Sequence, residues 1–427
     1  MDITTFIKKN VTSCHLTETL KKILSEEGFT LLSMGEPWKL QAGAYMSAPS
    51  DSLLFAWVIG EDYNAGDAMR IGVAHTDYPT FHIKPAAEIQ SDYCLLDTET
   101  YGGAILPSWF DRPLGVAGRV FYRDGERCAM RLVDSIVPVV TIPNQAIHYN
   151  RDVNKGVEVK KQLDMRPLAG TKTRPGWFRS YVSSLADCEE EDLLDYDLWL
   201  YNSDEPETVG IAQDMISSPR LDNQTSCYAL SEALCEAAVK RKGLVLAAFY
   251  DNEEIGSQTK QGADSALLKM LLEKIYDGLA MAPVRLSEAV MKSRMISCDV
   301  AHAMHPNHPE RFDAANSAVF GDGIVLKMSV NQRYTYEASM ISEMELLCRK
   351  YAIPYKKHVN HSDMPGGSTM GPLVSSWLPM PTLDVGVPIM AMHSARELMA
   401  KQDMEAFTAF AKAFFTDWTQ FCNTLFG

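Results

Sequence analysis

Apolar and polar positions follow a helical period in some parts of the chain and a strand-like pattern in others. Residues 16–27 (LTETLKKILSEE) carry apolar side chains at helical spacing and stop at Gly28, which predicts an early helix that ends at glycine. From about residue 53 to 85, the apolar runs SLLFAWVIG and RIGVAH are separated by the turn-like EDYNAGD. This stretch therefore predicts the first strands of a sheet.

The segment from residue 86 to 210 has a different pattern. It is rich in proline and contains β-rich pieces such as GVAGRVFY and SIVPVVTI. Its acidic run DCEEEDLLDYD is expected to form a solvated surface rather than a metal site. We therefore predict an inserted β-rich domain over residues 86–210.

After residue 210, apolar strands alternate with amphipathic helices. The helices are predicted over 224–242, 262–277 and 337–351, and this alternation is typical of a mostly parallel sheet. The two parts that flank the insertion, 1–85 and 211–427, are then expected to form one discontinuous α/β domain.

The composition is that of a globular protein with an acidic surface. Hydrophobic residues make up 46% and charged residues 22% of the 427 residues, so we expect a folded core. The formal charge of -15 argues against nucleic-acid or anionic-membrane partners, which attract clusters of Lys and Arg. The nine cysteines are scattered and never spaced C-x-x-C, which predicts reduced residues rather than disulfides or a thiolate zinc site. They are Cys14, Cys94, Cys128, Cys188, Cys227, Cys235, Cys298, Cys348 and Cys422.

Targeting and membrane signals are not expected in this chain. The opening MDITTFIKKNVTSCH lacks the apolar stretch of a signal peptide, and no later apolar run approaches the roughly 18 residues of a membrane span. We therefore expect a cytoplasmic protein that acts on peptides or small molecules.

Side chains with metal-binding chemistry follow several of the predicted strands. RIGVA runs into His75, LVLAAFYDN into Glu253 and Glu254, RMISC into Asp299, and VPIMAM into His393. Any one of them alone is more often a structural hydrogen-bonding residue. In an open α/β sheet, however, ligands bind beyond the carboxyl ends of the strands, so we expect these side chains to gather at one edge.

The types of side chain favour a catalytic metal centre. Imidazole and carboxylate without thiolate are typical of catalytic zinc, whereas structural zinc prefers cysteine-rich sets. Asp222 precedes a predicted helix whose dipole favours negative charge, and its carboxylate is suited to bridge two ions. Two metal ions about 3.5–4 Å apart can polarise a carbonyl and activate water. We expect zinc, two ions per subunit, although manganese or cobalt would accept the same ligands.

Neighbouring acids suggest a division of work at this centre. Glu253 and Glu254 are adjacent, so one can bind metal while the other takes a proton from water. Asp77, two residues after His75, is expected to accept the second ring N–H and orient the imidazole. The Gly-rich PGGSTMGP at 365–372 lacks a phosphate-loop pattern and is expected to form a tight turn.

At these residues the sequence resembles the aspartyl aminopeptidase family of dinuclear zinc peptidases. The resemblance is carried by six ordered segments, which are GVAHTDYPTFHIKP, YGGAILPSWFDRPLGVAGRV, SPRLDNQTSCYAL, FYDNEEIGSQTKQGA, ISCDVAHAMHPNHP, and GGSTMGP with LDVGVPIMAMHSARE. It implies an α/β peptidase domain with an inserted β-rich dimerisation domain, built into a hollow dodecamer.

The resemblance also implies a role for each metal-site residue. One metal ion would be held by His75, Asp222 and Asp299. The second would be held by Asp222, Glu254 and His393. Glu253 matches the family's general base, and Asp77 matches the acid that orients a ligand.

Three further residues resemble substrate-binding positions of the family. His148, in NQAIHYNRDVN, resembles a histidine that the insertion lends to the neighbouring subunit's active site. His302 resembles a residue that faces the substrate, and Lys327 one near the side-chain pocket. Departures in HTDYP and WFDRPL touch no expected ligand but leave open whether acidic, neutral or basic N-terminal residues are preferred.

The residues therefore predict a zinc aminopeptidase that removes the N-terminal residue of peptides, with Asp or Glu as one candidate specificity. Two other functions are open at this point. One is an inactive relative that binds metal and serves as an assembly scaffold or cargo. The other is a dinuclear hydrolase of another substrate class, such as N-acyl or phosphoester compounds.

Overall fold

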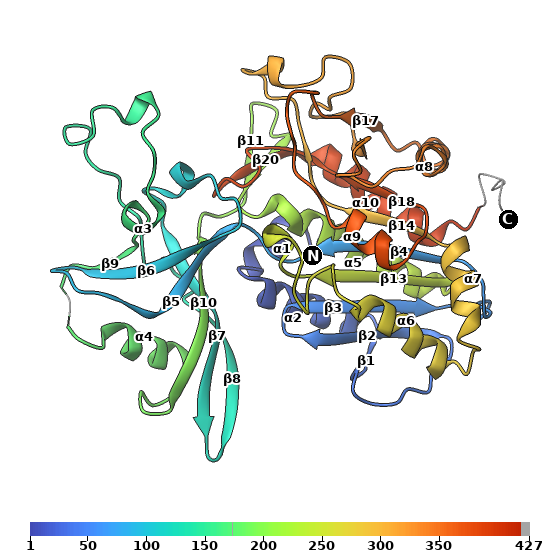
Figure 1. The fold of residues 1–427 in the computed structure, drawn as a ribbon, viewed down its shortest axis with the longest axis horizontal. Coiled ribbons are helices and arrows are strands. Elements are labelled where there is room, and N and C mark those ends of the chain that lie inside the picture. The colour runs from blue at the N-terminus through green and yellow to red at the C-terminus, as the bar shows by residue number, and fades with distance from the viewer. Residues whose placement is uncertain (173, 420–427) are drawn as a thin grey trace.

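Two large sheets dominate the architecture. The computed structural model describes residues 1–172 and 174–419, so Cys422 lies outside the described residues. Figure 1 shows a nine-stranded sheet flanked by helices on the right and a six-stranded sheet on the left. A smaller five-stranded sheet, which includes β11 (Glu207–Val209) and β20 (Glu397–Ala400), lies between them (Figure 1).

The nine-stranded sheet is mixed but mostly parallel, as predicted. In spatial order its strands are β1 (Thr30–Leu31), β2 (Gly43–Ser50), β3 (Leu53–Ile59), β13 (Leu244–Tyr250), β4 (Met69–His75), β14 (Arg294–Cys298), β18 (Thr382–Gly386), β16 (Ile324–Met328) and β17 (Tyr355–Val359). Its antiparallel neighbours are β2–β3, β3–β13 and β16–β18, and the other pairs are parallel.

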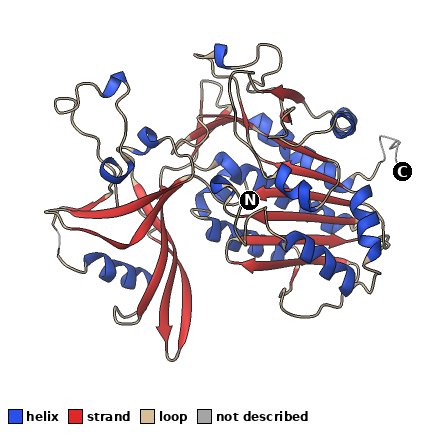
Figure 2. Cartoon of the chain, in the orientation of Figure 1, coloured by secondary structure: helices blue, strands red, loops and turns tan. Residues whose placement is uncertain are grey.

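Both faces of this sheet are buried, and its neighbouring strands β3 and β13 are apolar and buried at every position. Along β3, the side chain of Phe55 packs into one core and that of Ala56 into the other, as the alternation of a strand requires. Figure 2 shows helices on both sides of the strands. One face is covered by α1 (Ile3–Lys9), α2 (Ser13–Glu26), α5 (Leu221–Lys240), α8 (Ala338–Lys350) and α10 (Lys401–Thr416). The other is covered by α6 (Leu267–Gly278), α7 (Val284–Lys292) and α9 (Gly371–Trp377).

The predicted helices are confirmed with small shifts at their ends. The helix expected over 16–27 is α2, which begins after the capping residue Thr12 and is followed by Gly28 at a φ of 84°. The helices expected over 224–242 and 337–351 are α5 and α8. The helix expected over 262–277 is α6, which begins later because residues 262–266 form turns.

The six-stranded sheet is antiparallel throughout its named pairs. In spatial order it contains β8 (Arg127–Asp134), β7 (Leu114–Asp124), β10 (Leu193–Asn202), β5 (Thr80–Ile89), β6 (Cys94–Tyr101) and β9 (Leu168–Gly170). The short helices η1 (Leu106–Trp109), η2 (Val153–Lys155) and α3 (Lys161–Asp164) and the longer α4 (Trp177–Ala186) lie in its connections. The boundary expected at residue 86 falls inside β5, so the sheet begins earlier than predicted, at Thr80.

The five-stranded sheet joins segments that are far apart in the sequence. It contains β11 (Glu207–Val209), β12 (Met215–Ser218), β20 (Glu397–Ala400), β19 (Pro388–Met390) and β15 (Ala301–His302). The short helices η3 (Glu253–Ile255) and η4 (Pro309–Arg311) lie in loops of the same half of the chain. Within the described residues, no helix is both long and apolar enough to cross a membrane.

Candidate metal centre

The carboxyl ends of three adjacent strands bring predicted site residues to one edge of the nine-stranded sheet. β4 ends at His75, and its two neighbours in the sheet are β13 and β14. Asp299 follows β14 directly, while Glu253 and Glu254 form the short helix η3 just after β13. The predicted clustering at one edge is therefore confirmed for these strands.

His393 reaches the same place by a route that differs from the prediction. The apolar run VPIMAM forms β19, which belongs to the five-stranded sheet and not to the parallel sheet. The chain leaves the large sheet at the end of β18, and a turn after β19 places His393 at a φ of 67°. The placement of VPIMAM among the strands of the large sheet was therefore wrong, because a short apolar run does not reveal which sheet it joins.

Asp222 lies at the start of α5, where the helix is irregular. Asp222 and Asn223 have non-helical backbone angles, and the peptide bond between them is cis. The backbone N–H of Asp222 donates to Oε2 of Glu397 at 3.0 Å. The side chain is almost fully buried.

The carboxylate of Asp222 lies between the two imidazoles. Its Oδ1 is 3.4 Å from Nε2 of His75, and its Oδ2 is 3.4 Å from Nε2 of His393. On the first side, Oδ1 of Asp299 is 3.5 Å from the same nitrogen of His75. On the second side, Oε2 of Glu254 is 3.4 Å from the same nitrogen of His393. The five side chains form two groups that share Asp222.

The hydrogen bonds of the imidazoles turn their Nε2 atoms toward the carboxylates. Nδ1 of His75 lies 3.1 Å from the carbonyl oxygen of Asp77, and Nδ1 of His393 lies 3.3 Å from that of Gly103. A carbonyl oxygen can only accept, so each neutral ring donates from Nδ1 and keeps an Nε2 lone pair. In the neutral ring this lone pair faces carboxylate oxygens, so either a proton on Nε2 or a bound cation would balance their negative charge.

The spacing and chemistry of these atoms fit zinc. Two ligand atoms at about 2.0–2.1 Å from a tetrahedral zinc ion are roughly 3.3–3.4 Å apart, which matches the separations across each group. Oδ1 of Asp222 and Oε1 of Glu254 are buried without a hydrogen-bond partner. One donor atom from each of His75, Asp222 and Glu254 also lies within 4.8 Å of the others. The donor set of imidazole and carboxylate is that of a catalytic site.

The pKa shifts of the buried side chains also favour a metal site. Burial and the nearby Asp222 raise the pKa of Glu254 well above its usual value. Burial opposes a charge on His393, but Asp222 and Glu254 outweigh it and raise the pKa of the imidazole to about 10. Both shifts arise because buried carboxylates lack positive charge, and bound cations would supply that charge and favour the ionised carboxylates.

Asp77 connects the first imidazole to the two glutamates. Its Oδ1 is 3.3 Å from Nδ1 of His75 and accepts the backbone N–H of Glu253 at 3.2 Å. Its Oδ2 accepts the backbone N–H of Glu254 at 3.1 Å. Burial raises the pKa of Glu253 to about 8. Glu253 is therefore a carboxyl group at the centre whose backbone is held by Asp77.

A family model described as aminopeptidase I zinc metalloprotease (M18) matches residues 6–415. The chain belongs to the M18 family. It is similar to the probable M18 family aminopeptidase 2 of Clostridium novyi, with 40% identity over 408 residues that cover 93% of this chain and 94% of the relative. It is also similar to aspartyl aminopeptidase 4 of Saccharomyces cerevisiae, with 34% identity over 462 residues that cover 98% and 94%.

Solved structures agree with this assignment. A chain in the cryo-EM structure of the Ape4 and Nbr1 complex has a TM-score of 0.94 and 29% identity, covering 97% of this chain and 85% of that chain. A chain in the structure of the S. cerevisiae mApe1 dodecamer has a TM-score of 0.86 and 26% identity, covering 97% and 96%. This M18 chain has the family's α/β fold, and it is a zinc metallo-aminopeptidase.

Two residues around this M18 centre carried no signal in the sequence pattern. Glu397, on β20, is 3% exposed and accepts the backbone N–H groups of both Asp222 and His393, the latter at 2.9 Å. Tyr101, at the end of β6, donates its hydroxyl to Oδ2 of Asp77 at 2.7 Å. Both lie within segments quoted for the family resemblance, but only the folded chain brings them next to the predicted metal ligands.

The three predicted substrate residues lie in different surroundings. Lys327, on β16, is 2% exposed, and its Nζ is 3.4 Å from Oδ2 of Asp299. His302 lies on β15, and burial lowers the pKa of its imidazole to about 4. His148 is exposed in the long loop between β8 and α3, which extends from the six-stranded sheet (Figure 1). Their roles toward substrate stay predictions.

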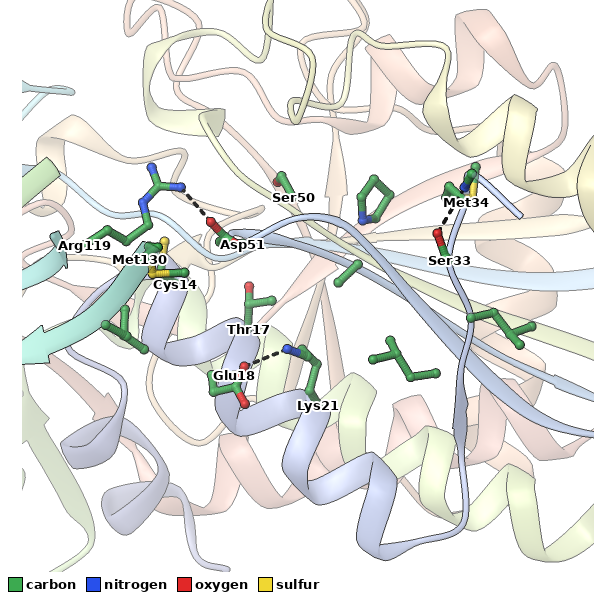
Figure 3. Close-up of a pocket in the computed structure, with 16 residues that line it drawn as sticks. Cys14, Thr17, Glu18, Lys21, Ser33, Met34, Ser50, Asp51, Arg119 and Met130 are labelled. Atoms are coloured by element: carbon green, nitrogen blue, oxygen red, sulfur yellow. Dashed lines mark hydrogen bonds and ion pairs between the residues drawn. The ribbon is translucent and has the colours of Figure 1, made fainter. Parts of the chain in front are cut away.

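A separate pocket of about 680 Å³ lies away from these ligands. Figure 3 shows its walls, which come from α2, residues 31–35, the end of β2 with the turn after it, and the middle of β7 and β8. Ion pairs between Arg119 and Asp51, at 3.2 Å, and between Lys21 and Glu18, at 2.7 Å, line it. Its walls include none of the predicted ligands, so its size does not identify it as the catalytic site.

Proposed function

We propose that this aminopeptidase holds two zinc ions per subunit and removes the N-terminal residue of peptides at that centre. His75, Asp222 and Asp299 would hold one ion. Asp222, Glu254 and His393 would hold the other. The observation that supports this proposal best is that the two oxygens of Asp222 face different imidazoles at 3.4 Å each.

Glu253 is the proposed general base. When bound, the zinc ions would supply Lewis-acid polarisation of the scissile carbonyl and a lower pKa for water. The Glu253 carboxylate would take a proton from the attacking water and return it to the departing amine. Asp77 would hold the backbone of Glu253 and the ring of His75 in place, as the hydrogen bond and the ion-pair distance above suggest.

The substrate preference proposed is for N-terminal Asp or Glu. Relatives named aspartyl aminopeptidase support it, with 34% identity to the S. cerevisiae protein. Lys327 and His302 would contact the substrate side chain, because a buried ammonium group favours a carboxylate through a charge-assisted hydrogen bond. Manganese or cobalt could replace zinc at such ligands.

Self-association is proposed to complete the active site. Residues 86–210 would form a dimerisation domain, and His148 in its exposed loop would reach the active site of a neighbouring subunit. Dimers would assemble into a dodecamer, for which the S. cerevisiae mApe1 dodecamer is the support. A cytoplasmic location is proposed because all the described cysteines are free, including the exposed Cys128.

The proposal is tested with Glu253→Gln and a substrate panel. The variant should keep two zinc ions per chain, measured by elemental analysis, and lose roughly 10²–10⁴-fold in turnover. The panel contains aminoacyl anilides that differ in the first side chain, beside N-acyl and phosphoester compounds. Near-normal turnover of Glu253→Gln on the anilides would refute the mechanism. A wild-type protein that binds zinc but cleaves no anilide would indicate the scaffold function instead.

A further inference from the structure

We propose that Tyr101 is a positioning residue for the catalytic centre, through which the six-stranded sheet holds Asp77 and the Glu253–Glu254 turn in register with the metal ligands. The inference rests on the proposed roles of Asp77 and Glu253. It concerns the YGG segment at the end of β6, to which the proposed function assigns no task.

The hydroxyl of Tyr101 joins two loops of the catalytic centre. It donates to Oδ2 of Asp77 at 2.7 Å and accepts from Nδ2 of Asn252 at 3.0 Å. Asn252 immediately precedes Glu253, adopts a left-handed φ of 64°, and is fixed in turn by Thr259, whose hydroxyl donates to its Oδ1 at 2.9 Å. Because one phenol OH both donates and accepts, it ties the loop after β4 to the loop after β13.

Asp77 is the acceptor on which this network converges. Besides Tyr101, its two oxygens accept the backbone N–H groups of Glu253 and Glu254. If the Asp77 carboxylate rotated, its hydrogen bonds to the backbone N–H groups of both glutamates would break. Its Oδ1 atom would also move away from the ring of His75. Outer groups that orient metal ligands are typically worth 10- to 100-fold in metal affinity or activity.

The next two residues contact the second half of the centre. At Gly102, which has a φ of 70°, a side-chain Cβ would lie 3.1 Å from Cβ of Glu254. The carbonyl of Gly103 accepts from Nδ1 of His393, and the backbone N–H of Ile105 donates to the carbonyl of His393 at 2.9 Å. Consecutive residues of one segment thus touch Asp77, Glu254 and His393.

This segment is anchored in the six-stranded sheet. The ring of Tyr101 packs edge-on against Trp199 of β10 at 5.0 Å between centroids, and Trp199 contacts His82 of β5 at 4.6 Å. Aromatic packing of this kind restricts the rotation of the phenol. The orientation of the hydroxyl is therefore set by a sheet that contributes none of the proposed metal ligands.

A cavity of about 240 Å³ beside the Tyr101 hydroxyl limits the effect expected from removing that hydroxyl. Asp77, Tyr101, Trp199 and Asn252 line it, together with residues of other elements. Water that enters this space could replace one lost hydrogen bond at Asp77. We therefore expect removal of the hydroxyl to weaken the centre rather than abolish it.

The test is Tyr101→Phe in the full-length zinc-loaded protein. We expect kcat to fall about 10- to 100-fold with KM changed less than about twofold, because the change acts on Asp77 and not on substrate contacts. Zinc should leave the variant at least about tenfold faster when a chromogenic chelator is added. The melting temperature and the elution volume should stay close to those of the wild type.

Tyr201→Phe is the matched control. Tyr201 lies on β10 of the same sheet, and its hydroxyl donates to Oδ1 of Asp134 at 2.7 Å, so the substitution removes the same kind of bond elsewhere. It should leave kcat and zinc release unchanged. Gly102→Ala is a second variant, which should also speed zinc release because its Cβ crowds Glu254.

Several outcomes would overturn the proposal. Tyr101→Phe with wild-type kcat and wild-type zinc release would refute it, as would equal losses in Tyr201→Phe. If Tyr101→Phe does not fold, zinc release from Gly102→Ala at the wild-type rate would refute it. Zinc release is read without turnover, so failure of the Glu253 mechanism is detected separately through Glu253→Gln.

Discussion

The buried carboxylate of Glu397 accepts the backbone N–H of Asp222 at 3.0 Å. Its other oxygen accepts the backbone N–H of His393 at 2.9 Å. Glu397 therefore fixes the main chain of Asp222, which would bridge the two ions, and that of His393, which lies in the turn after β19. Such a contact sets the distance between ligands that no local sequence pattern connects.

Glu397→Gln should weaken zinc binding about 10- to 100-fold. The amide keeps one acceptor, but its NH₂ group faces a backbone N–H, so one of the two hydrogen bonds is lost. Competition with a chelator of known affinity measures the change. Glu343→Gln is the control, because Glu343 is similarly buried but pairs with Arg294 at the opposite end of β14. Unchanged zinc affinity in Glu397→Gln would contradict this role.

Removal of the metal should lower the stability of the fold. Without cations, Glu254 is a buried carboxylate beside that of Asp222, and burial together with Asp222 raises its pKa well above the usual value. Free zinc at 100 times its Kd would contribute about 2.7 kcal/mol to the free energy of unfolding. The melting temperature should fall with a chelator and recover with zinc. Asp222→Asn should respond to neither, and a full response in that variant would argue against the shared ligand.

Lys327→Met should show whether Lys327 recognises acidic substrate side chains or only neutralises the carboxylate of Asp299. If the ammonium group selects acidic substrates, kcat/KM for N-terminal Asp or Glu should fall roughly 10- to 100-fold, the value of a hydrogen bond between charged groups. Turnover of an alanyl substrate reports the loss of the contact with Asp299, which is 3.4 Å away. Equal losses on both substrates would mean that Lys327 serves Asp299 alone.

His15, which is not one of the predicted metal ligands, should make the free energy of unfolding depend on pH. Burial lowers the pKa of its imidazole to about 4, from a usual value of 6.5, so the unfolded chain binds the proton more tightly. The contribution of neutral His15 to the free energy of unfolding is fully present above pH 6.5. It is lost as the pH falls from 6.5 toward 4, which lowers the free energy of unfolding by roughly 2–3 kcal/mol. Urea unfolding of zinc-loaded protein at pH 7.5 and pH 5 measures the loss.

His15→Asn is the comparison for this measurement. The amide can keep the contact that Nδ1 makes with the hydroxyl of Thr12 at 2.8 Å, but it does not titrate. The variant should therefore lose less stability than the wild type between the two pH values. A loss as large as that of the wild type would show that other groups cause the dependence.

Local pattern was enough to predict the parts of this protein whose structure depends on near neighbours in the chain. The helical period of residues 16–27 and the mainly apolar strands before His75 and Asp299 follow from backbone geometry and burial. These patterns also placed three of the strand ends at one edge of a mostly parallel sheet. The chemistry of imidazole and carboxylate then predicted a metal centre, and the M18 family is described as one of zinc metalloproteases.

The tertiary structure decided which distant segments meet, and the sequence carries no periodic signal for that. The run before His393 reads as a strand, but only the packed fold assigns β19 to the five-stranded sheet. Glu397 and Tyr101 read as ordinary strand residues, yet one holds the backbone of Asp222 and the other holds Asp77. Their roles depend on contacts between residues up to 175 positions apart, which form only when the sheets pack together.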